Sequence, residues 1–300
     1  MRSACVSATR KPAVVGLLVL SACVTASHST PNQAVQGTAG ESPRPAPPPI
    51  APDVATGPPS PIGRMAHIPE TTYRMGTDAG EPDERPVHEV HVAVFDMDLT
   101  EVTVGEYAEC VRASSCVPAP TLVQFPGVTT ADQQRYDAEC NDNRAERQDH
   151  PENCVDWSMA DAYCRWAGKR LPTEEEWEYA ACGGNCDDAL SKRGGMATIL
   201  GAERWPFTIR VAEVGSGPFG LYDMADNVWE WTASRYCAYD RPGCADPRGV
   251  IRGGSWSMLD VLYVRLTDRS PADPSNRNTN LGFRCARSSA PSAGGAAVPP

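Results

Sequence analysis

Residues 168–180 read GKRLPTEEEWEYA, and this stretch carries the signals of an α-helix. Thr173, with Glu176 three positions later, fits a capping box, the side-chain pairing that opens an α-helix. Trp177 and Ala180 then fall on one face of that helix, and we expect this face to be buried. The glutamates of the first turn stabilise the positive end of the helix dipole, so we interpret them as structural and not as catalytic.

Other elements are predicted from the same kinds of signal. Thr103 opens a second helix with a capping box, and a third helix opens at Ser158. Residues 90–95 alternate as in a β-strand. His88 and His91 would point to opposite faces of such a strand, so we interpret them as surface residues and not as metal ligands.

Three later blocks complete the signature. Residues 220–231 read GLYDMADNVWEW, residues 252–256 read RGGSW, and residues 282–285 read GFRC. Together with the first stretch, these blocks resemble the formylglycine-generating enzyme (sulfatase-modifying factor) family, and they stand in the family's order. The resemblance begins near Ile68 and ends at Arg287, so it covers essentially the whole folded part.

The resemblance implies an α+β fold. The family's domain is C-type-lectin-like and forms a single unit, with sparse regular secondary structure and several disulfides. Between Cys186 and Arg248 the sequence is rich in Gly, Pro and Asp and loses its periodicity, which indicates loops. We therefore expect one formylglycine-generating-enzyme-like domain over residues 63–287.

The family's best-known chemistry depends on residues that this chain lacks. The enzyme uses two thiolates to hold copper(I), because soft sulfur ligands select that ion. Residues 253–284 contain no cysteine, and alignment on the RGGSW block places Met258 and Tyr263 at the two expected positions. We therefore predict no catalytic residue of this kind and no tight copper site.

The block from Asp223 to Glu230 is the best candidate site. Hard cations such as calcium bind carboxylates together with backbone carbonyls. The resemblance implies one structural calcium ion held by the side chains of Asp223 and Glu230 and by the carbonyls of Asp226 and Val228.

The same residues also have a purely structural interpretation. Asp223 would cap the turn, and Glu230 would pair with an arginine such as Arg252 or Arg284. The family's second ion site draws on an asparagine before this block; residues 194–206 contain none, so we expect no second ion.

The RGGSW block has two interpretations as well. By resemblance it forms the floor of the substrate cleft, where Arg252, Ser255 and Trp256 lie beside Trp229. A tight turn with a core tryptophan would explain the two glycines equally well.

The chain has 12 cysteines, and ten of them follow the N-terminal segment that holds Cys5 and Cys23. An even number in an exported chain indicates disulfides. A zinc site is the alternative, but the sequence has no Cys-x-x-Cys pair. The short spacings favour three bridges, namely Cys110 with Cys116, Cys182 with Cys186, and Cys237 with Cys244. The resemblance implies a bridge between Cys164 and Cys285, which leaves Cys140 with Cys154.

The N-terminus predicts export. Residues 1–22 have a basic start and a short apolar run, as in a signal peptide, and the run is shorter than the ~20 residues of a spanning helix. The sequence LSAC at residues 20–23 resembles the lipobox of bacterial lipoproteins, which implies acylation of Cys23. Ordinary secretion with cleavage after an Ala-x-Ala-like site is the alternative.

The remaining segments predict how the domain is placed. Residues 23–62 form a Pro/Ala/Ser-rich tether, because such a composition cannot bury enough apolar surface to order itself. Residues 288–300 form a disordered tail. Val24 after the lipobox favours the outer membrane by resemblance, so we expect a protein lipid-anchored to the bacterial cell envelope.

The overall charge restricts the function. A formal net charge of −11 argues against binding to nucleic acid. We expect an envelope-exposed, non-catalytic domain that binds an unidentified protein, peptide or glycan. The alternative is an oxidoreductase of the same family, such as a non-haem iron or copper-dependent oxygenase, with formylglycine generation the least favoured. Iron would need histidine and carboxylate ligands, and no His-x-x-x-His pair is present.

Overall fold

The computed structural model describes residues 63–121, 123, 129–131, 134, 139–142, 144–186, 207–213, 215–257 and 265–289, all within one compact unit. Several predicted features lie outside these residues: the signal peptide, the tether with Cys23, most of the tail, and the positions Met258 and Tyr263. No helix among the described residues is long and apolar enough to cross a membrane.

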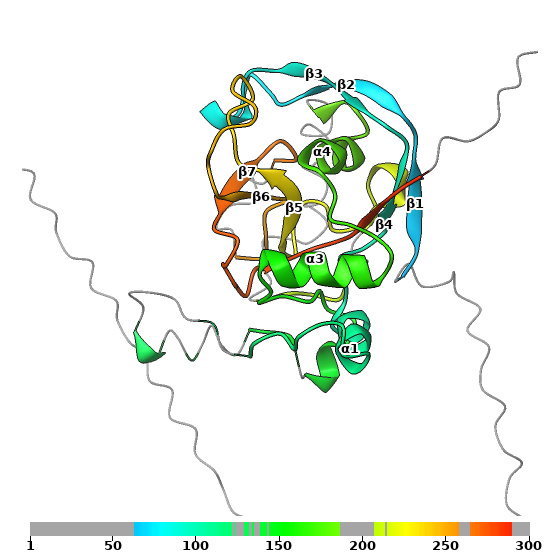
Figure 1. Cartoon of the computed structure of the whole chain (residues 1–300), viewed down its shortest axis with the longest axis vertical. Coiled ribbons are helices and arrows are strands. Elements are labelled where there is room, and N and C mark those ends of the chain that lie inside the picture. The colour runs from blue at the N-terminus through cyan, green and yellow to red at the C-terminus, as the bar shows by residue number, and fades with distance from the viewer. Residues whose placement is uncertain are drawn as a thin grey trace, which may run out of the picture. The chain divides into compact units, whose positions relative to one another are not determined.

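The first and last strands of the domain belong to the same three-stranded sheet (Figure 1). β1 (Met65–Ile68) and β9 (Ala286–Ser288) lie antiparallel on either side of β4 (Phe95–Asp98). Ile68 and Phe95 are fully buried beneath this sheet. The sheet therefore brings the two ends of the described unit together, and β9 ends one residue beyond the expected domain boundary.

A two-stranded sheet follows β1. β2 (Thr71–Met75) pairs antiparallel with β3 (His88–Val92). The single strand expected over residues 90–95 is wrong, because two residues separate β3 from β4 and the two strands belong to different sheets. In β3, His88 is half-buried and His91 is exposed.

A four-stranded sheet forms the other half of the unit. Its order is β7 (Arg269–Ala272), β6 (Gly249–Arg252), β5 (Trp229–Arg235) and β8 (Leu281–Gly282). β5 and β8 are parallel, and the other neighbours are antiparallel. Trp231 of β5 is fully buried, so the C-terminal end of the signature block 220–231 contributes directly to the core.

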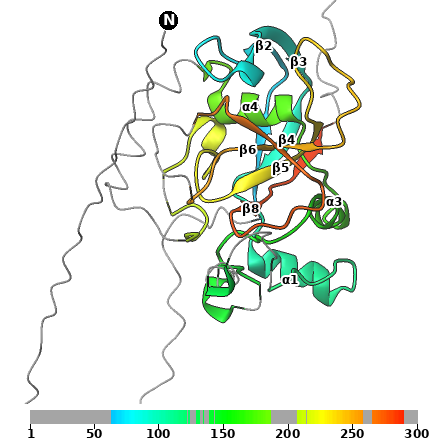
Figure 2. The same ribbon diagram turned by 90° about the vertical axis from the view of Figure 1, so that its left-hand side faces the viewer.

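Two helices begin where the capping boxes predict. α1 (Val104–Arg112) and α4 (Glu174–Cys182) are capped by Thr103 and Thr173, whose hydroxyls each accept the third N–H of the helix at 3.2 Å. Trp177 of α4 is fully buried, as expected. α4 lies between the β2–β3 pair and the four-stranded sheet, and α1 lies at the opposite end of the unit (Figures 1 and 2).

The third helix begins earlier than predicted. α3 (Trp157–Trp166) is capped by Asp156 and not by Ser158. The Asp156 carboxylate accepts the N–H of Met159 at 3.0 Å, and Arg277 donates to its other oxygen at 2.6 Å. Both residue types cap helices well, and the contact with Arg277 from a distant segment positions the aspartate.

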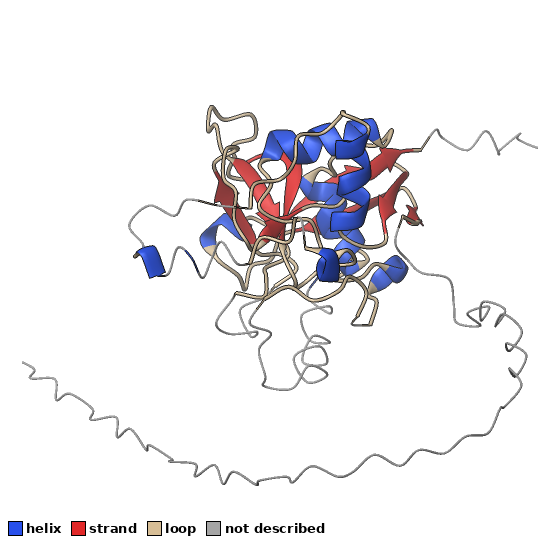
Figure 3. Ribbon diagram, turned by 90° about the horizontal axis from the view of Figure 1, so that it is seen from below, coloured by secondary structure: helices blue, strands red, loops and turns tan. Residues whose placement is uncertain are grey.

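Regular structure makes up a minor part of the described residues, and loops connect and cover it (Figure 3). Short 3-10 helices η1 (Pro82–Glu84), η2 (Ala145–Arg147) and η3 (Pro218–Gly220) add single turns. Two main hydrophobic clusters hold these loops, one around Trp177 and the other around Trp231. This arrangement confirms the predicted α+β fold with sparse regular structure.

All ten cysteines of the described residues form disulfides, in the pairs expected from the sequence. The Cys164–Cys285 bridge spans 121 residues and joins α3 to the segment before β9. The other four close shorter loops: Cys110–Cys116, Cys140–Cys154, Cys182–Cys186 and Cys237–Cys244. Four of the five disulfides lie within the hydrophobic clusters, so they link the loops to the core, and Cys237–Cys244 closes a loop outside these clusters.

Candidate functional site

Two side chains tie the loop before β5 to an earlier segment. Asp223 and Asn227 have positive φ angles of 57° and 56°, so the loop folds back on itself. Asp223 Oδ2 accepts the N–H of Ala212 at 2.7 Å, and Asn227 Oδ1 accepts the N–H of Ile209 at 3.1 Å. The predicted ion-binding block is therefore packed against residues 207–213, with Asp223 almost fully buried.

Glu230 lies in β5, fully buried, and pairs with Arg284. Arg284 Nη2 is 2.7 Å from Oε1 of the glutamate, and Nε is 2.8 Å from Oε2. Trp177 Nε1 donates to Oε2 at 2.8 Å. Burial disfavours the charged guanidinium, but the carboxylate of Glu230 outweighs burial and raises the pKa of Arg284. Both oxygens of Glu230 are thus occupied, as the structural interpretation expects.

Arg284 has no N–H group left for another partner. Its Nη1 donates to the carbonyls of Asp98 and Leu99, both at 3.2 Å, and Nη2 donates to the carbonyl of Tyr222 at 2.8 Å. A guanidinium has five N–H donors. The three carbonyls and the two bonds to Glu230 account for all five.

Glu101, in the connection between β4 and α1, is a site residue that sequence reasoning missed. It is fully buried, and neither carboxylate oxygen has a hydrogen-bond partner. Its carboxyl group lies close enough to that of Asp223 for the two charges to interact. Burial and then the charge of Asp223 raise the pKa of Glu101 well above its usual value, although Arg284 opposes this. The sequence around Glu101 has no ligand spacing, so only its apolar flanks hinted at burial.

The calcium prediction can be tested against these contacts. Asp223 fits a hard cation, because its Oδ1 is buried and accepts no hydrogen bond. Glu230 fits less well, because Arg284 and Trp177 already use both of its oxygens. No three His, Cys, Asp or Glu side chains converge on one point in the described part of the chain, so any such site uses at most two carboxylates and otherwise carbonyls or water.

The RGGSW block lies above a buried ionic network. Arg252 has no exposed surface and bonds to Glu174 at 3.0 Å and to Glu178 at 2.5 Å. The side chain of Arg252 is therefore part of the buried core below the predicted cleft floor and cannot contact a ligand at the surface. Gly253 has φ 101°, and a Cβ there would lie 3.1 Å from the ring of Trp177. The glycine allows the backbone to pass over this tryptophan.

Three of the predicted cleft residues, Trp229, Ser255 and Trp256, belong to a polar cluster that also contains Ser257 and Asn280. Ser255 and Ser257 are 3.0 Å apart through their hydroxyls, and Asn280 Nδ2 donates to Ser257 at 2.7 Å and to Ser255 at 3.3 Å. The N–H of Trp229 donates to the carbonyl of Asn280 at 2.8 Å, and Trp256 follows Ser255 in the chain. Ser257 and Asn280 were not predicted, because serine and asparagine are common in any loop.

The polar cluster consists of neutral hydrogen-bonding groups and indole rings. Ser257, Asn280, Trp229 and Trp256 are half-buried, whereas Ser255 is buried. The cluster itself contains no thiol, imidazole or carboxylate. It can therefore bind amides or hydroxyls by hydrogen bonds and stacking.

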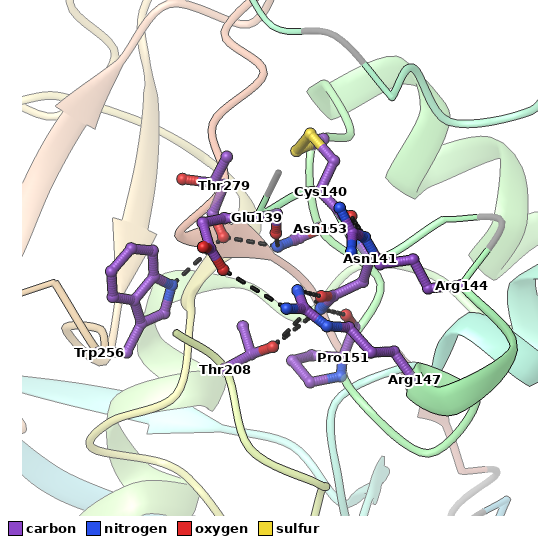
Figure 4. Close-up of a disulfide and its surroundings, with 11 residues drawn as sticks. Glu139, Cys140, Asn141, Arg144, Arg147, Pro151, Asn153, Thr208, Trp256 and Thr279 are labelled. Carbon is purple, nitrogen blue, oxygen red and sulfur yellow. Dashed lines mark hydrogen bonds and ion pairs between the residues drawn. A yellow bond between two sulfur atoms is a disulfide. The ribbon is translucent and has the colours of Figure 1, made fainter. Parts of the chain in front are cut away.

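Trp256 connects this cluster to the Cys140–Cys154 disulfide (Figure 4). The carbonyl of Thr279 accepts bonds from Trp256 Nε1 at 3.3 Å and from Asn153 Nδ2 at 2.6 Å. Asn153 also donates to the carbonyl of Glu139 at 2.9 Å. The disulfide region thus holds the outer edge of the cluster in place.

Comparison with known proteins agrees with this architecture. The model of the sulfatase-modifying factor enzyme 1-like domain matches residues 51–289. The Bos taurus protein named inactive C-alpha-formylglycine-generating enzyme 2 is 34% identical over 269 residues, which cover 74% of this chain and 87% of the relative. The formylglycine-generating enzyme of Mycobacterium tuberculosis is 31% identical over 293 residues, which cover 75% and 97%.

Solved structures show the same fold. The structure of PvdO from Pseudomonas aeruginosa superposes with a TM-score of 0.56 at 26% sequence identity. The match covers 74% of this chain and 93% of PvdO.

Proposed function

This chain belongs to the sulfatase-modifying factor family, and we propose that its domain binds a protein, peptide or glycan without oxidising a cysteine. The state of the cysteines carries this proposal. Every cysteine of the described residues is in a disulfide, and residues 253–284 contain none. The family's reaction uses thiolates to hold the copper(I) ion at which oxygen is activated, and the described residues supply no free thiol for this.

Overall similarity does not separate the two kinds of relative. One of the similar proteins is named inactive and another is named a formylglycine-generating enzyme, at 34% and 31% identity. The cysteine positions are therefore the better guide. The oxygenase alternative gains no support from the described residues, where no histidine and carboxylate set converges.

The surface around Ser257 and Asn280 is the binding site that we propose. Its hydroxyls and amide can hydrogen-bond to peptide or sugar groups, and the half-buried rings of Trp229 and Trp256 offer stacking area. Truncating Ser257→Ala or Asn280→Ala should weaken binding to an immobilised peptide or glycan about fivefold or more. Ser275→Ala, at an exposed turn, is the matched control and should leave binding unchanged.

The non-catalytic half of the proposal has a direct test. A Cys-x-Pro-x-Arg peptide is incubated with the protein, copper, oxygen and reductant, and its mass is measured. We expect no conversion to the aldehyde above a no-protein control. Aldehyde well above that control would overturn the proposal.

We propose that the domain is lipid-anchored to the bacterial cell envelope, at the outer membrane, through Cys23. The lipobox-like LSAC at residues 20–23 supports this. The Cys23→Ser variant should move from the membrane to the soluble fraction. A wild-type protein that is already soluble, with its N-terminus elsewhere, would refute the anchor.

We also propose one calcium ion at the loop that contains Asp223. The support is the buried Oδ1 of this residue, which lacks a donor and suits a hard cation. Calcium should raise the melting temperature relative to EGTA, because an ion bound only to the native state stabilises it. Equal melting temperatures in millimolar-order calcium and in EGTA would rule the ion out.

A further inference from the structure

We infer that Asn153 is a positioning residue of the proposed binding site, because its buried side chain fixes the backbone carbonyl to which the indole of Trp256 is bound. The inference rests on the proposed function of this site. It extends the site to a residue that lies 126 positions before Thr279 in the sequence and does not reach the surface.

The side-chain amide of Asn153 is fully buried and bonds to three backbone groups. Its Nδ2 donates to the carbonyl of Thr279 at 2.6 Å and to that of Glu139 at 2.9 Å. Its Oδ1 accepts the N–H of Asn141 at 2.8 Å. Exchanging the amide oxygen and nitrogen would turn the oxygen toward two carbonyls, so a single orientation satisfies all three groups.

The carbonyl of Thr279 links Asn153 to the binding site. It accepts the bond from Asn153 and a second bond from Trp256 Nε1 at 3.3 Å, as Figure 4 shows. A carbonyl oxygen has two lone pairs, and these two donors use both. The position of this oxygen therefore determines where the indole of Trp256 lies, and Asn153 forms the shorter of the two bonds that hold it.

Bonds on either side of this carbonyl fix the backbone from which the side chain of Asn280 projects. The N–H of Cys154 donates to the carbonyl of Asn278 at 3.1 Å, and the carbonyl of Asn280 accepts the N–H of Trp229 at 2.8 Å. With the bonded carbonyl of Thr279 between them, three consecutive carbonyls are held. The hydrogen-bonding side chain of Asn280 therefore starts from a fixed backbone.

Contacts within the domain hold Asn153 in place without a ligand. The next residue, Cys154, forms a disulfide with Cys140. Cys154 has a φ angle of 61°, in the left-handed region that is unfavourable for residues other than glycine. Such a conformation persists only where the surrounding structure fixes it, and here the disulfide and the bond to Asn278 do so. An amide that is fixed in advance lowers the entropy that the site loses on binding.

The first test measures the indole of Trp256 in Asn153→Ala and in a matched control. Asn141→Ala is the control, because Asn141 is also fully buried and its side chain bonds to three residues, none of them within residues 278–280. The NMR signal of the Trp256 indole N–H is identified by its absence in Trp256→Phe. We expect its hydrogen exchange to become about tenfold faster in Asn153→Ala and to stay unchanged in Asn141→Ala, since only Asn153 holds the carbonyl of Thr279.

The second test measures binding to two immobilised probes, a Cys-x-Pro-x-Arg peptide and the neutral oligosaccharide chitohexaose. Asn153→Ala should weaken binding of the probe that Ser257→Ala weakens, by about fivefold or more, whereas Asn141→Ala should leave it unchanged. Equal losses in Asn153→Ala and Asn141→Ala would show that both residues only support the fold, and would overturn the inference.

The remaining outcomes separate this inference from the proposed function. If neither probe binds the wild type, or if Ser257→Ala binds as the wild type does, the proposed function fails, and the exchange of the Trp256 indole alone decides the inference. Unchanged exchange in Asn153→Ala would overturn the inference whatever happens to binding. If Asn153→Ala does not fold, Asn153→Ser, which keeps one donor on a smaller side chain, takes its place with the same expected results.

Discussion

Two buried acidic regions of this domain are neutralised in different ways. Beneath β6, Glu174 and Glu178 receive the guanidinium groups of Arg252 and Arg269, with contacts of 2.5 to 3.0 Å. Glu101, at the connection between β4 and α1, receives no guanidinium or other donor.

The difference separates a finished structural network from a candidate site. A buried carboxylate that has its arginine is neutralised as soon as the chain folds, and little is left for a ligand to contribute. A buried carboxylate without one still needs a cation or a proton. Glu101 and Glu152 are both buried without such a partner, so each of them must be either protonated or compensated by a cation.

Removing the guanidinium of Arg252 from the region around Glu174 and Glu178 should give the largest loss of stability. Arg252→Met would leave Glu178 buried without its ion pair and Glu174 with only Arg269. We expect a loss of about 3–5 kcal/mol in the free energy of unfolding, measured by urea denaturation. Arg165→Ala breaks an exposed pair with Asp161 and serves as the control, with a loss of about 1 kcal/mol or less. Equal losses in both variants would refute the comparison.

The variant Glu230→Gln tests whether Glu230 is a structural partner of Arg284 or a calcium ligand. The variant keeps the size of the side chain but removes the charge that faces Arg284, so we expect a loss of about 2 kcal/mol. The loss should be the same in EGTA and in calcium, because we regard this residue as structural. A loss confined to calcium would instead make Glu230 a ligand, as the sequence suggested.

Glu152 offers a smaller effect of opposite sign. Burial, and then the charge of Asp142, raise the pKa of Glu152 well above 4.5. Glu152→Gln should therefore stabilise the protein by about 1 kcal/mol at pH 7.

The pH dependence of that gain checks its cause. The pKa of Glu152 is higher in the folded protein than in the unfolded chain. Neutral Glu152 therefore causes no loss of stability below the unfolded-state pKa near 4.5, and stability falls as the pH rises from there toward the folded-state pKa. Urea unfolding of the variant and the wild type should thus agree near pH 4 and diverge by pH 7. A gain that is the same at both pH values would point to packing instead of charge.

Much of the fold could be predicted because its signals are local or belong to the family. The capping boxes at Thr103 and Thr173 involve residues three positions apart, and the structure confirms both. The disulfide pairs followed from short spacings and from the resemblance. The predicted start of α3 was wrong. Asp156 caps this helix in place of Ser158, and its carboxylate is held by Arg277, which lies far along the chain.

The family, the α+β domain and the lack of cysteines in residues 253–284 could be predicted from residue identities, and three disulfides from short spacings, whereas Cys164–Cys285 was implied by the resemblance. Which buried acids are paired became clear from the tertiary structure alone. Glu230 forms an ion pair with Arg284, which is 54 residues away in the sequence. Glu101 is influenced by the charge of Asp223, and no arginine forms a hydrogen bond with it. Such contacts are set by how irregular loops pack, and loops lack the periodicity from which a sequence predicts neighbours.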